Sequence, residues 1–178
     1  MIFFCHTGIS QNTYTNCDLG FQISKPNERW DFDTDLNAVK IIRTGQPPEE
    51  YFLGGVYVAT TEYDHVLVAV FNDARLKRQS LNEWVDDLEK IAQYYNATTI
   101  KKEVALDEDW AIYAAKFSDM DGLGYSEQII KIKNKKAYLI QSMGLDLNLR
   151  TEKQDKEFDY IFDSFKTFQT FPQILFGS

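Results

Sequence analysis

Four strand-like segments with very short connections constrain the fold more than any other feature of this chain. The segments read TTIKKEVAL at 98–106, WAIYAAKFS at 110–118, YSEQIIKIK at 125–133 and KAYLIQSMGL at 136–145, and only DED, DMDGLG and NK separate them. Parallel neighbours in a sheet need a crossover of about a dozen residues or more, for which these connections have no room. The sequence therefore predicts an antiparallel meander over residues 98–145.

Two segments with helical periodicity flank the meander. In SLNEWVDDLEKIAQYYN, Ser80 and Glu83 have the spacing of a capping box, in which each side chain accepts a hydrogen bond from a free backbone N–H at the helix start. Thr151 and Gln154 repeat this spacing at the start of a final helix. The predicted apolar faces are Leu81, Trp84, Val85, Leu88, Ile91, Ala92 and Tyr95 in the first helix, and Phe158, Ile161, Phe162 and Phe165 in the second. Each one-sided helix must pack on an apolar surface.

Further strands are predicted ahead of the first helix, at LGFQIS (19–24), VKIIRT (39–44), VYVATT (56–61) and HVLVAVF (65–71). The last is apolar nearly throughout, which is typical of a strand at the centre of a sheet with both faces covered. This order of elements predicts an α/β protein of the α+β type. We expect a three-layer α/β/α sandwich, whose central, mainly antiparallel sheet has about six to seven strands flanked by helices. Residues 1–17 are predicted as a flexible lead and residues 18–178 as a single domain.

The charge and the N-terminal sequence bear on partners and location. The formal net charge of −8 argues against a nucleic-acid partner, because nucleic acids are bound through Lys and Arg that neutralise phosphates. No stretch approaches the ~18 apolar residues of a transmembrane segment. The start, MIFFCHTG, lacks the basic region of a secretory signal. We expect an extracytoplasmic protein whose signal peptide is absent from this sequence, with a cytoplasmic location as the alternative. Cys5 and Cys17 would pair only in an oxidising compartment.

Several residues along the chain resemble one known family. They are Gly20, Phe21, Ile23, Pro26 and Trp30 at the first strand, the SLNEW helix start at Ser80, and Ile161, Ser164 and Phe165 at the end of the last helix. In these residues and in the order of its elements, the chain resembles the PsbP family, which comprises an extrinsic photosystem II subunit and its non-photosynthetic bacterial and archaeal relatives. The resemblance implies a binding and assembly scaffold, and it brings no catalytic residue. Many members are exported.

Asp31, Asp33 and Asp35 form the first candidate site. They imitate the opening of a calcium-binding EF-hand loop, but such a loop needs Gly at its sixth position and Glu at its twelfth, where this chain has Leu36 and Ile42. An EF-hand is therefore excluded. Alternate residues of an extended segment share a side, so a looser divalent-cation site and a solvated acidic loop both stay open. No other cofactor is expected.

Other polar residues are better explained by turns and strand ends. Asp107 and Asp109 lie in a predicted turn, as do Asp119 and Asp121, where Asp-Gly suits a hairpin loop. His65 starts a strand and has no recognisable nucleophile beside it. No glycine-rich nucleotide-binding motif is present in the sequence.

The loop predicted over 45–55 is the second candidate site. Tyr51, Phe52 and Leu53 lie there between Pro-Pro and Gly-Gly, and they either form an exposed anchor for a partner or fold over the sheet. The sequence thus favours a non-enzymatic PsbP-like binding or assembly domain that recognises a protein partner. A small-ligand or divalent-cation binding protein is the alternative, and a hydrolase of unknown substrate is the third hypothesis.

Overall fold

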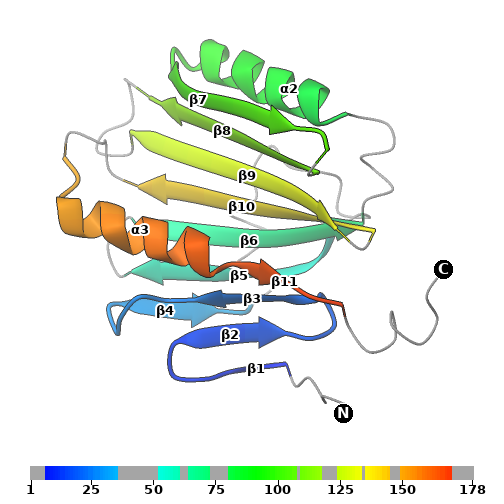
Figure 1. The fold of residues 1–178 in the computed structure, drawn as a ribbon. Coiled ribbons are helices and arrows are strands. Elements are labelled where there is room, and N and C mark those ends of the chain that lie inside the picture. The colour runs from blue at the N-terminus through cyan, green and yellow to red at the C-terminus, as the bar shows by residue number, and fades with distance from the viewer. Residues whose placement is uncertain are drawn as a thin grey trace.

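A computed structural model describes residues 7–35, 52–60, 64–72, 80–107, 109–117, 124–133, 135–144 and 149–169. Within these ranges the chain forms a seven-stranded sheet, a four-stranded sheet and two helices, which is an α+β fold (Figure 1). No helix in these ranges is long and apolar enough to cross a membrane.

The larger sheet is antiparallel throughout, in the order β4-β5-β6-β10-β9-β8-β7. Its strands are β4 (Trp30–Asp33), β5 (Phe52–Thr60), β6 (His65–Asn72), β7 (Thr98–Ala105), β8 (Trp110–Lys116), β9 (Tyr125–Lys133) and β10 (Lys136–Gly144). The four consecutive strands β7 to β10 are neighbours in the sheet, so the predicted meander is confirmed. The strand predicted at 39–44 lies outside the described residues.

The smaller sheet has the order β1-β2-β3-β11, with β1 (Gly8–Ile9), β2 (Thr13–Asn16), β3 (Phe21–Ser24) and β11 (Lys166–Thr167). Strands β1 and β2 lie in the segment that was predicted as a flexible lead, whereas the structure pairs β2 with β3. Tyr14, which pairs with Ile23, is the buried residue that holds β2 on the core. Its neighbours in the sequence are polar, so the segment shows no apolar pattern that would predict a strand. Thr13 and Ser24 share a hydrogen bond of 2.8 Å between their hydroxyl groups. The domain boundary at residue 18 stays a prediction.

Both predicted capping boxes are present, at Ser80 for α2 (Leu81–Tyr94) and at Thr151 for α3 (Glu152–Ser164). The buried residues of α2 are Leu81, Trp84, Val85, Leu88 and Ala92. The prediction was wrong for Ile91 and Tyr95, whose exposed fractions are 45% and 55%. The reason is the position of α2 over β7 and β8 at the edge of the sheet, which covers only one side of the helix (Figure 1).

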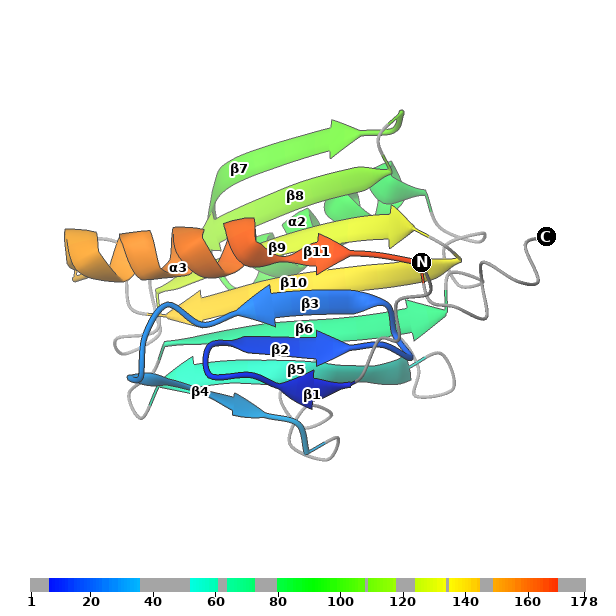
Figure 2. The ribbon, with the colours of Figure 1, turned by 60° about the horizontal axis from the view of Figure 1, so that its bottom comes forward.

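Two apolar cores lie on opposite faces of the larger sheet. Alternate residues of β6 show this, because Leu67 and Ala69 join the core under α2, whereas Val66 and Val68 join the core under α3 and the smaller sheet. Figure 2 shows α3 and the smaller sheet in front of the larger sheet, with α2 behind it. The predicted position of β6, central with both faces covered, is confirmed. The predicted α/β/α sandwich had one central sheet, whereas the structure also has a second, four-stranded sheet.

The glycines of LGG belong to a strand and not to the predicted loop. A bulge between Phe52 and Gly54 bends β5, and Gly54 has a φ of 147°, which side chains rarely adopt. A Cβ added to Gly55 would lie 2.1 Å from the backbone oxygen of Val68 on β6. Gly55 is therefore needed for a close approach between β5 and β6. In the sequence, a glycine in this role cannot be distinguished from a glycine that marks a loop.

Candidate functional site

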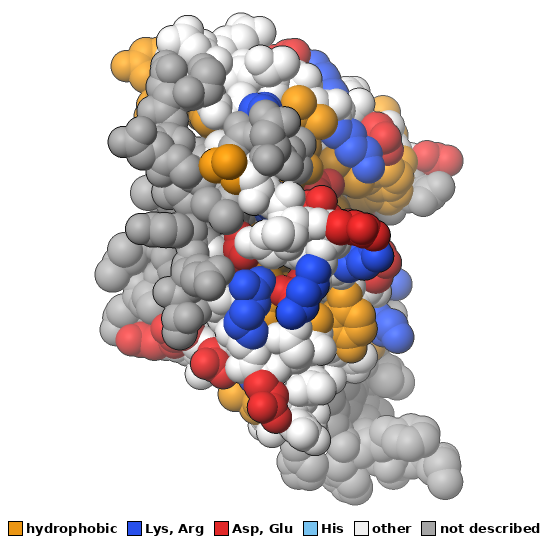
Figure 3. Space-filling model, turned by 90° about the vertical axis from the view of Figure 1, so that its left-hand side faces the viewer, with side chains coloured by type: hydrophobic (Ala, Val, Ile, Leu, Met, Phe, Trp, Pro, Cys, Tyr) orange, Lys and Arg blue, Asp and Glu red, His pale blue; other side chains and the backbone are white. Residues whose placement is uncertain are grey.

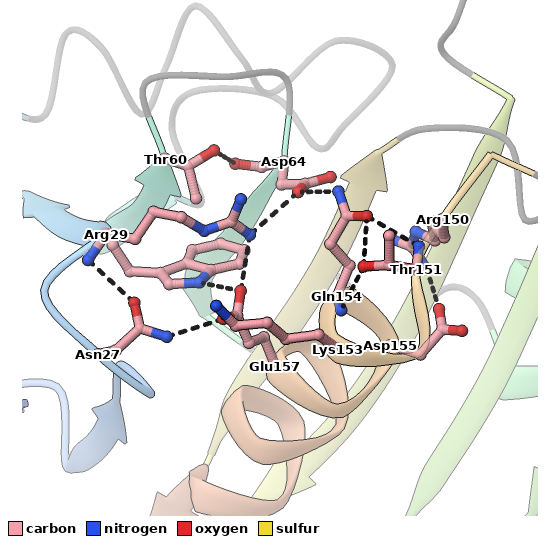
Figure 4. Close-up of polar contacts among 11 residues, drawn as sticks. Asn27, Arg29, Thr60, Asp64, Arg150, Thr151, Lys153, Gln154, Asp155 and Glu157 are labelled. Carbon is pink, nitrogen blue, oxygen red and sulfur yellow. Dashed lines mark hydrogen bonds and ion pairs between the residues drawn. The ribbon is translucent and has the colours of Figure 1, made fainter.

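A buried polar cluster lies at one end of the larger sheet, where α3 begins. We call it the α3 polar cluster, and its members are Asn27, Arg29, Trp30, Asp64, Arg150, Gln154 and Glu157 (Figure 4). The first three come from β4 and the turn before it, Asp64 immediately precedes β6, and the others belong to α3 or its approach. At this end of the molecule, charged side chains of both signs gather in the middle of the surface (Figure 3).

Glu157 is the centre of the cluster. Its carboxylate accepts hydrogen bonds from Asn27 Nδ2 at 2.8 Å, Arg29 Nη2 at 2.6 Å and Trp30 Nε1 at 3.0 Å. The side chain is only 5% exposed. Burial raises the pKa of Glu157. The three hydrogen bonds and the charge of Arg29 lower it by a larger amount, so the pKa lies below its ordinary value. Glu157 is therefore a buried carboxylate held in its charged form.

Asp64 connects Glu157 to the start of α3. It is 1% exposed, and its Oδ2 accepts a hydrogen bond from Gln154 Nε2 at 3.1 Å and lies 3.5 Å from Arg29 Nη2. The backbone oxygen of Asp64 accepts the N–H of Thr60 at 3.1 Å. Arg29 thus bridges two buried carboxylates, which fixes α3 against the ends of β4, β5 and β6.

Arg150 forms the other half of the cluster. Its side chain is 4% exposed, and the guanidinium carbon lies 4.9 Å from the Tyr125 ring centroid and 4.0 Å from the Phe158 ring centroid. Asp155 Oδ1 lies 3.6 Å from Nη1, whereas Nε and Nη2 have no hydrogen-bond partner within the described part of the chain. Burial lowers the pKa of Arg150, and Asp155 and Asp64 partly raise it again. The side chain stays charged, as arginine does in proteins.

These contacts indicate a fastening role for the α3 polar cluster. Its carboxylates are engaged by donors from segments about 130 residues apart in the sequence. Such bonds hold α3 in one position, since breaking any of them would leave a buried charge without its partner.

The three predicted aspartates lie on β4 and immediately after it. Asp31 and Asp33 share the exposed side of β4, opposite Trp30, and Asp35 follows the strand. Asp31 is 83% exposed and pairs with Lys25 at 3.3 Å, while Asp33 Oδ1 accepts the N–H of Asp35 at 2.8 Å. Among the described residues, no group of three or more His, Cys, Asp or Glu side chains could hold a metal ion. A cation site at these aspartates stays a prediction.

The second predicted site is divided by the start of β5. Phe52 packs on the core under α2, with its ring 5.7 Å from that of Phe71, whereas Leu53 is 44% exposed. Tyr51 lies outside the described residues. The proposal that Tyr51, Phe52 and Leu53 bind a partner stays a prediction, and Leu53 is the member shown at the surface.

The remaining candidates that fall within the described residues lie in turns or at strand ends. His65 starts β6, with its ring 5.1 Å from that of Tyr57. Asp109 has a φ of 57° and its backbone oxygen accepts the N–H of Ile132, as expected for a turn. Asp119 and Asp121 lie outside the described residues. Cys17 is disulfide-bonded, and Cys5 lies outside the described residues.

Sequence reasoning missed an exposed aromatic surface at the end of α2. Ile91, Tyr94 and Tyr95 have the i, i+3, i+4 spacing of one helix face, with exposed fractions of 45%, 81% and 55%. The two tyrosine rings meet edge to face, with centroids 5.1 Å apart and planes at 89°. We call these three residues the α2 patch. The signal in the sequence is the width of the apolar stripe in the last turn of the helix, which is greater than the width that can be buried against one sheet.

Comparisons with known proteins support the fold. No protein-family model and no curated protein matches the chain. The solution structure of cyanobacterial PsbP (CyanoP) from Synechocystis sp. PCC 6803 is similar to it, with a TM-score of 0.55 and 13% identity. The superposition covers 94% of this chain and 99% of that one. The chain therefore has a PsbP-like fold.

Proposed function

We propose that this chain is a non-enzymatic binding or assembly domain, a PsbP-like α/β/α sandwich that recognises a protein partner through the α2 patch. The observation that carries the proposal is the exposure of three large apolar side chains on one helix face. Tyrosine is enriched among the residues that dominate binding energy in protein interfaces, because it buries a large ring and still offers a hydroxyl.

The rigidity of α2 supports this function. The helix is capped at Ser80, and Trp84, Val85 and Leu88 anchor it in the core. A side chain that is already held in its bound geometry loses less entropy on binding. The edge-to-face contact between Tyr94 and Tyr95 restrains the two rings in the same way. The α2 patch is thus a preorganised surface.

The α3 polar cluster supports a structural role for the buried charges. Glu157 and Asp64 share Arg29, and their side chains also contact Asn27, Trp30, Lys153 and Gln154. These bonds join the second half of the chain to the first. They favour a scaffold whose charged groups maintain its shape over a site in which they act on a substrate.

We further propose an extracytoplasmic location. The disulfide bond of Cys17 supports it, because disulfides persist mainly in oxidising compartments. For the divalent-cation alternative, the described residues contain no group of three metal-binding side chains that would support it.

Quantitative affinity capture from the native host tests the proposal. The tagged wild type is compared with the Tyr94→Ala/Tyr95→Ala variant, and each protein enriched on the wild type alone is purified and titrated against both. We expect at least one such protein to bind directly, and more weakly to the variant. Equal binding to both proteins would show that the α2 patch is not the recognition surface.

A further inference from the structure

We infer that the partner segment bound by the α2 patch is cationic and presents Arg or Lys side chains beside apolar ones. The inference rests on the proposed function, and it specifies the chemistry of the partner. It is drawn from the charges along α2, from the end of the helix and from the exposed ring faces.

The surface of α2 around the patch is acidic. Its fourteen residues include four carboxylates, Glu83, Asp86, Asp87 and Glu89, and one ammonium group, Lys90. Glu83 and Asp87 continue the stripe of the patch, eight and four residues before Ile91.

Ion pairs reduce this charge without balancing it. Lys90 pairs with Asp87 at 2.9 Å, and Asp86 and Glu89 share Lys102 of β7 at 3.0 and 2.8 Å. Glu83 accepts its hydrogen bonds from the backbone and hydroxyl of Ser80, which are uncharged. The exposed surface of α2 therefore keeps a net negative charge.

The end of α2 adds to this potential. The C-terminal end of a helix carries a partial negative charge, which basic residues in the last turn often neutralise. The last turn of α2 has no basic residue. The tyrosines of the patch lie at this end, so a cation placed against them also meets a favourable backbone dipole.

The rings themselves are suited to a cation. Tyr94 is 81% exposed and touches Tyr95 edge to face, which leaves ring faces open. Guanidinium and ammonium groups bind such faces, and Arg also stacks flat on them. The chain already uses this contact internally, between Arg150 and the rings of Tyr125 and Phe158.

Other occupants meet an unfavourable charge. A second copy of the chain would bring the same acidic helix and a net charge of −8. Nucleic acids and anionic membrane surfaces would be repelled for the same reason. A basic, amphipathic protein segment combines the apolar contact with charge complementarity.

Selection from a phage library that displays random linear peptides tests the inference. The library is selected on the wild-type protein and on the Tyr94→Ala/Tyr95→Ala variant. The variant keeps every charge, so peptides that adhere to an acidic protein without using the patch are retained on both. Both residues are exposed, and equal melting temperatures of the two proteins verify the fold.

We expect the peptides enriched on the wild type alone to carry Arg or Lys next to Leu, Phe or Trp. Their affinity should fall about tenfold or more in the double variant. It should fall several-fold in Asp87→Asn, which keeps the tyrosines, and fall further at high salt. Tyrosine-dependent peptides that are neutral or acidic would overturn the cationic partner and leave the proposed function standing. If no enriched peptide depends on the tyrosines, the proposed function fails as well.

Discussion

Removing the charge of Glu157 should destabilise the fold strongly, with a characteristic dependence on pH. The substitution Glu157→Gln keeps the size of the side chain but takes the carboxylate from Arg29, Trp30 and Asn27. Removing one partner of a buried pair costs about 3–5 kcal/mol. The lower end applies here, because Arg29 is 31% exposed and keeps Asp64 at 3.5 Å. A loss of about 3 kcal/mol in a domain of this size lowers the Tm by roughly 6–12 °C.

The pKa of Glu157 fixes how this loss varies with pH. Its pKa in the folded protein lies below the ordinary value of 4.5, despite burial, because of the hydrogen bonds from Trp30, Arg29 and Asn27. A carboxylate with a lowered pKa stabilises the fold fully above its unfolded pKa, and this contribution disappears as the pH falls through the folded pKa. The free energies of unfolding of wild type and Glu157→Gln should therefore differ most above pH 4.5 and converge only as the pH falls through the lowered pKa of the folded state.

Urea denaturation followed by tryptophan fluorescence, repeated over a series of pH values, measures the size of the stability loss and its dependence on pH. Glu152→Gln on the same helix is the matched control, because Glu152 is 84% exposed and pairs with the exposed Lys156 at 2.5 Å. Its effect should stay below about 1 kcal/mol. A Glu157→Gln loss no larger than that of the control, or a loss that is the same at low and neutral pH, would refute the assigned role of the cluster.

Three further substitutions test the packing. Gly55→Ala should destabilise the fold by more than about 2 kcal/mol, because the new Cβ would lie 2.1 Å from the Val68 backbone oxygen. Thermal melting measures the effect, and an unchanged Tm would show that β5 and β6 do not approach so closely at Gly55. Ser80→Ala should cost about 1 kcal/mol by removing the capping box of α2, measured by urea denaturation, and no change would argue against that cap. Tyr138→Phe should cost roughly 1 kcal/mol, because the buried hydroxyl donates to the backbone oxygen of Leu19 at 2.9 Å. Burial raises the pKa of Tyr138 from 10.0 to about 12, so this tyrosine stabilises the fold below about pH 10 and loses its contribution as the pH rises through 12. The variant should therefore be less sensitive to alkali than the wild type, and equal alkaline unfolding curves would contradict the assignment.

Local signals explain why much of the fold could be predicted from the sequence. The capping boxes at Ser80 and Thr151 each depend on two residues three positions apart, and the meander follows from connection lengths. The residues that resemble the PsbP family also have a structural reason. Phe21, Ile23 and Trp30 are fully buried, and the ring of Trp30 meets Phe158 edge to face at 5.5 Å.

The parts that could not be predicted depend on contacts between distant segments. Tyr14 holds β2 on the core from within a polar stretch. The bonds of Glu157 to Asn27 and Trp30 join residues about 130 positions apart, so neither side shows a pattern of its own. The α2 patch was hidden for the opposite reason. Its periodicity is that of a buried helix face, and only the position of α2 at the sheet edge shows that Ile91 and Tyr95 stay exposed.

Site-specific photo-crosslinking in the native host tests the central claim most directly. A photoreactive benzophenone amino acid replaces Tyr94 in one protein and Lys153 in another, where Lys153 is 79% exposed on α3. The proposed function predicts a reproducible adduct with one protein from position 94, none with that protein from position 153, and loss of the adduct when Ile91 and Tyr95 are changed to alanine. An identical set of adducts from both positions, or none from position 94, would contradict it.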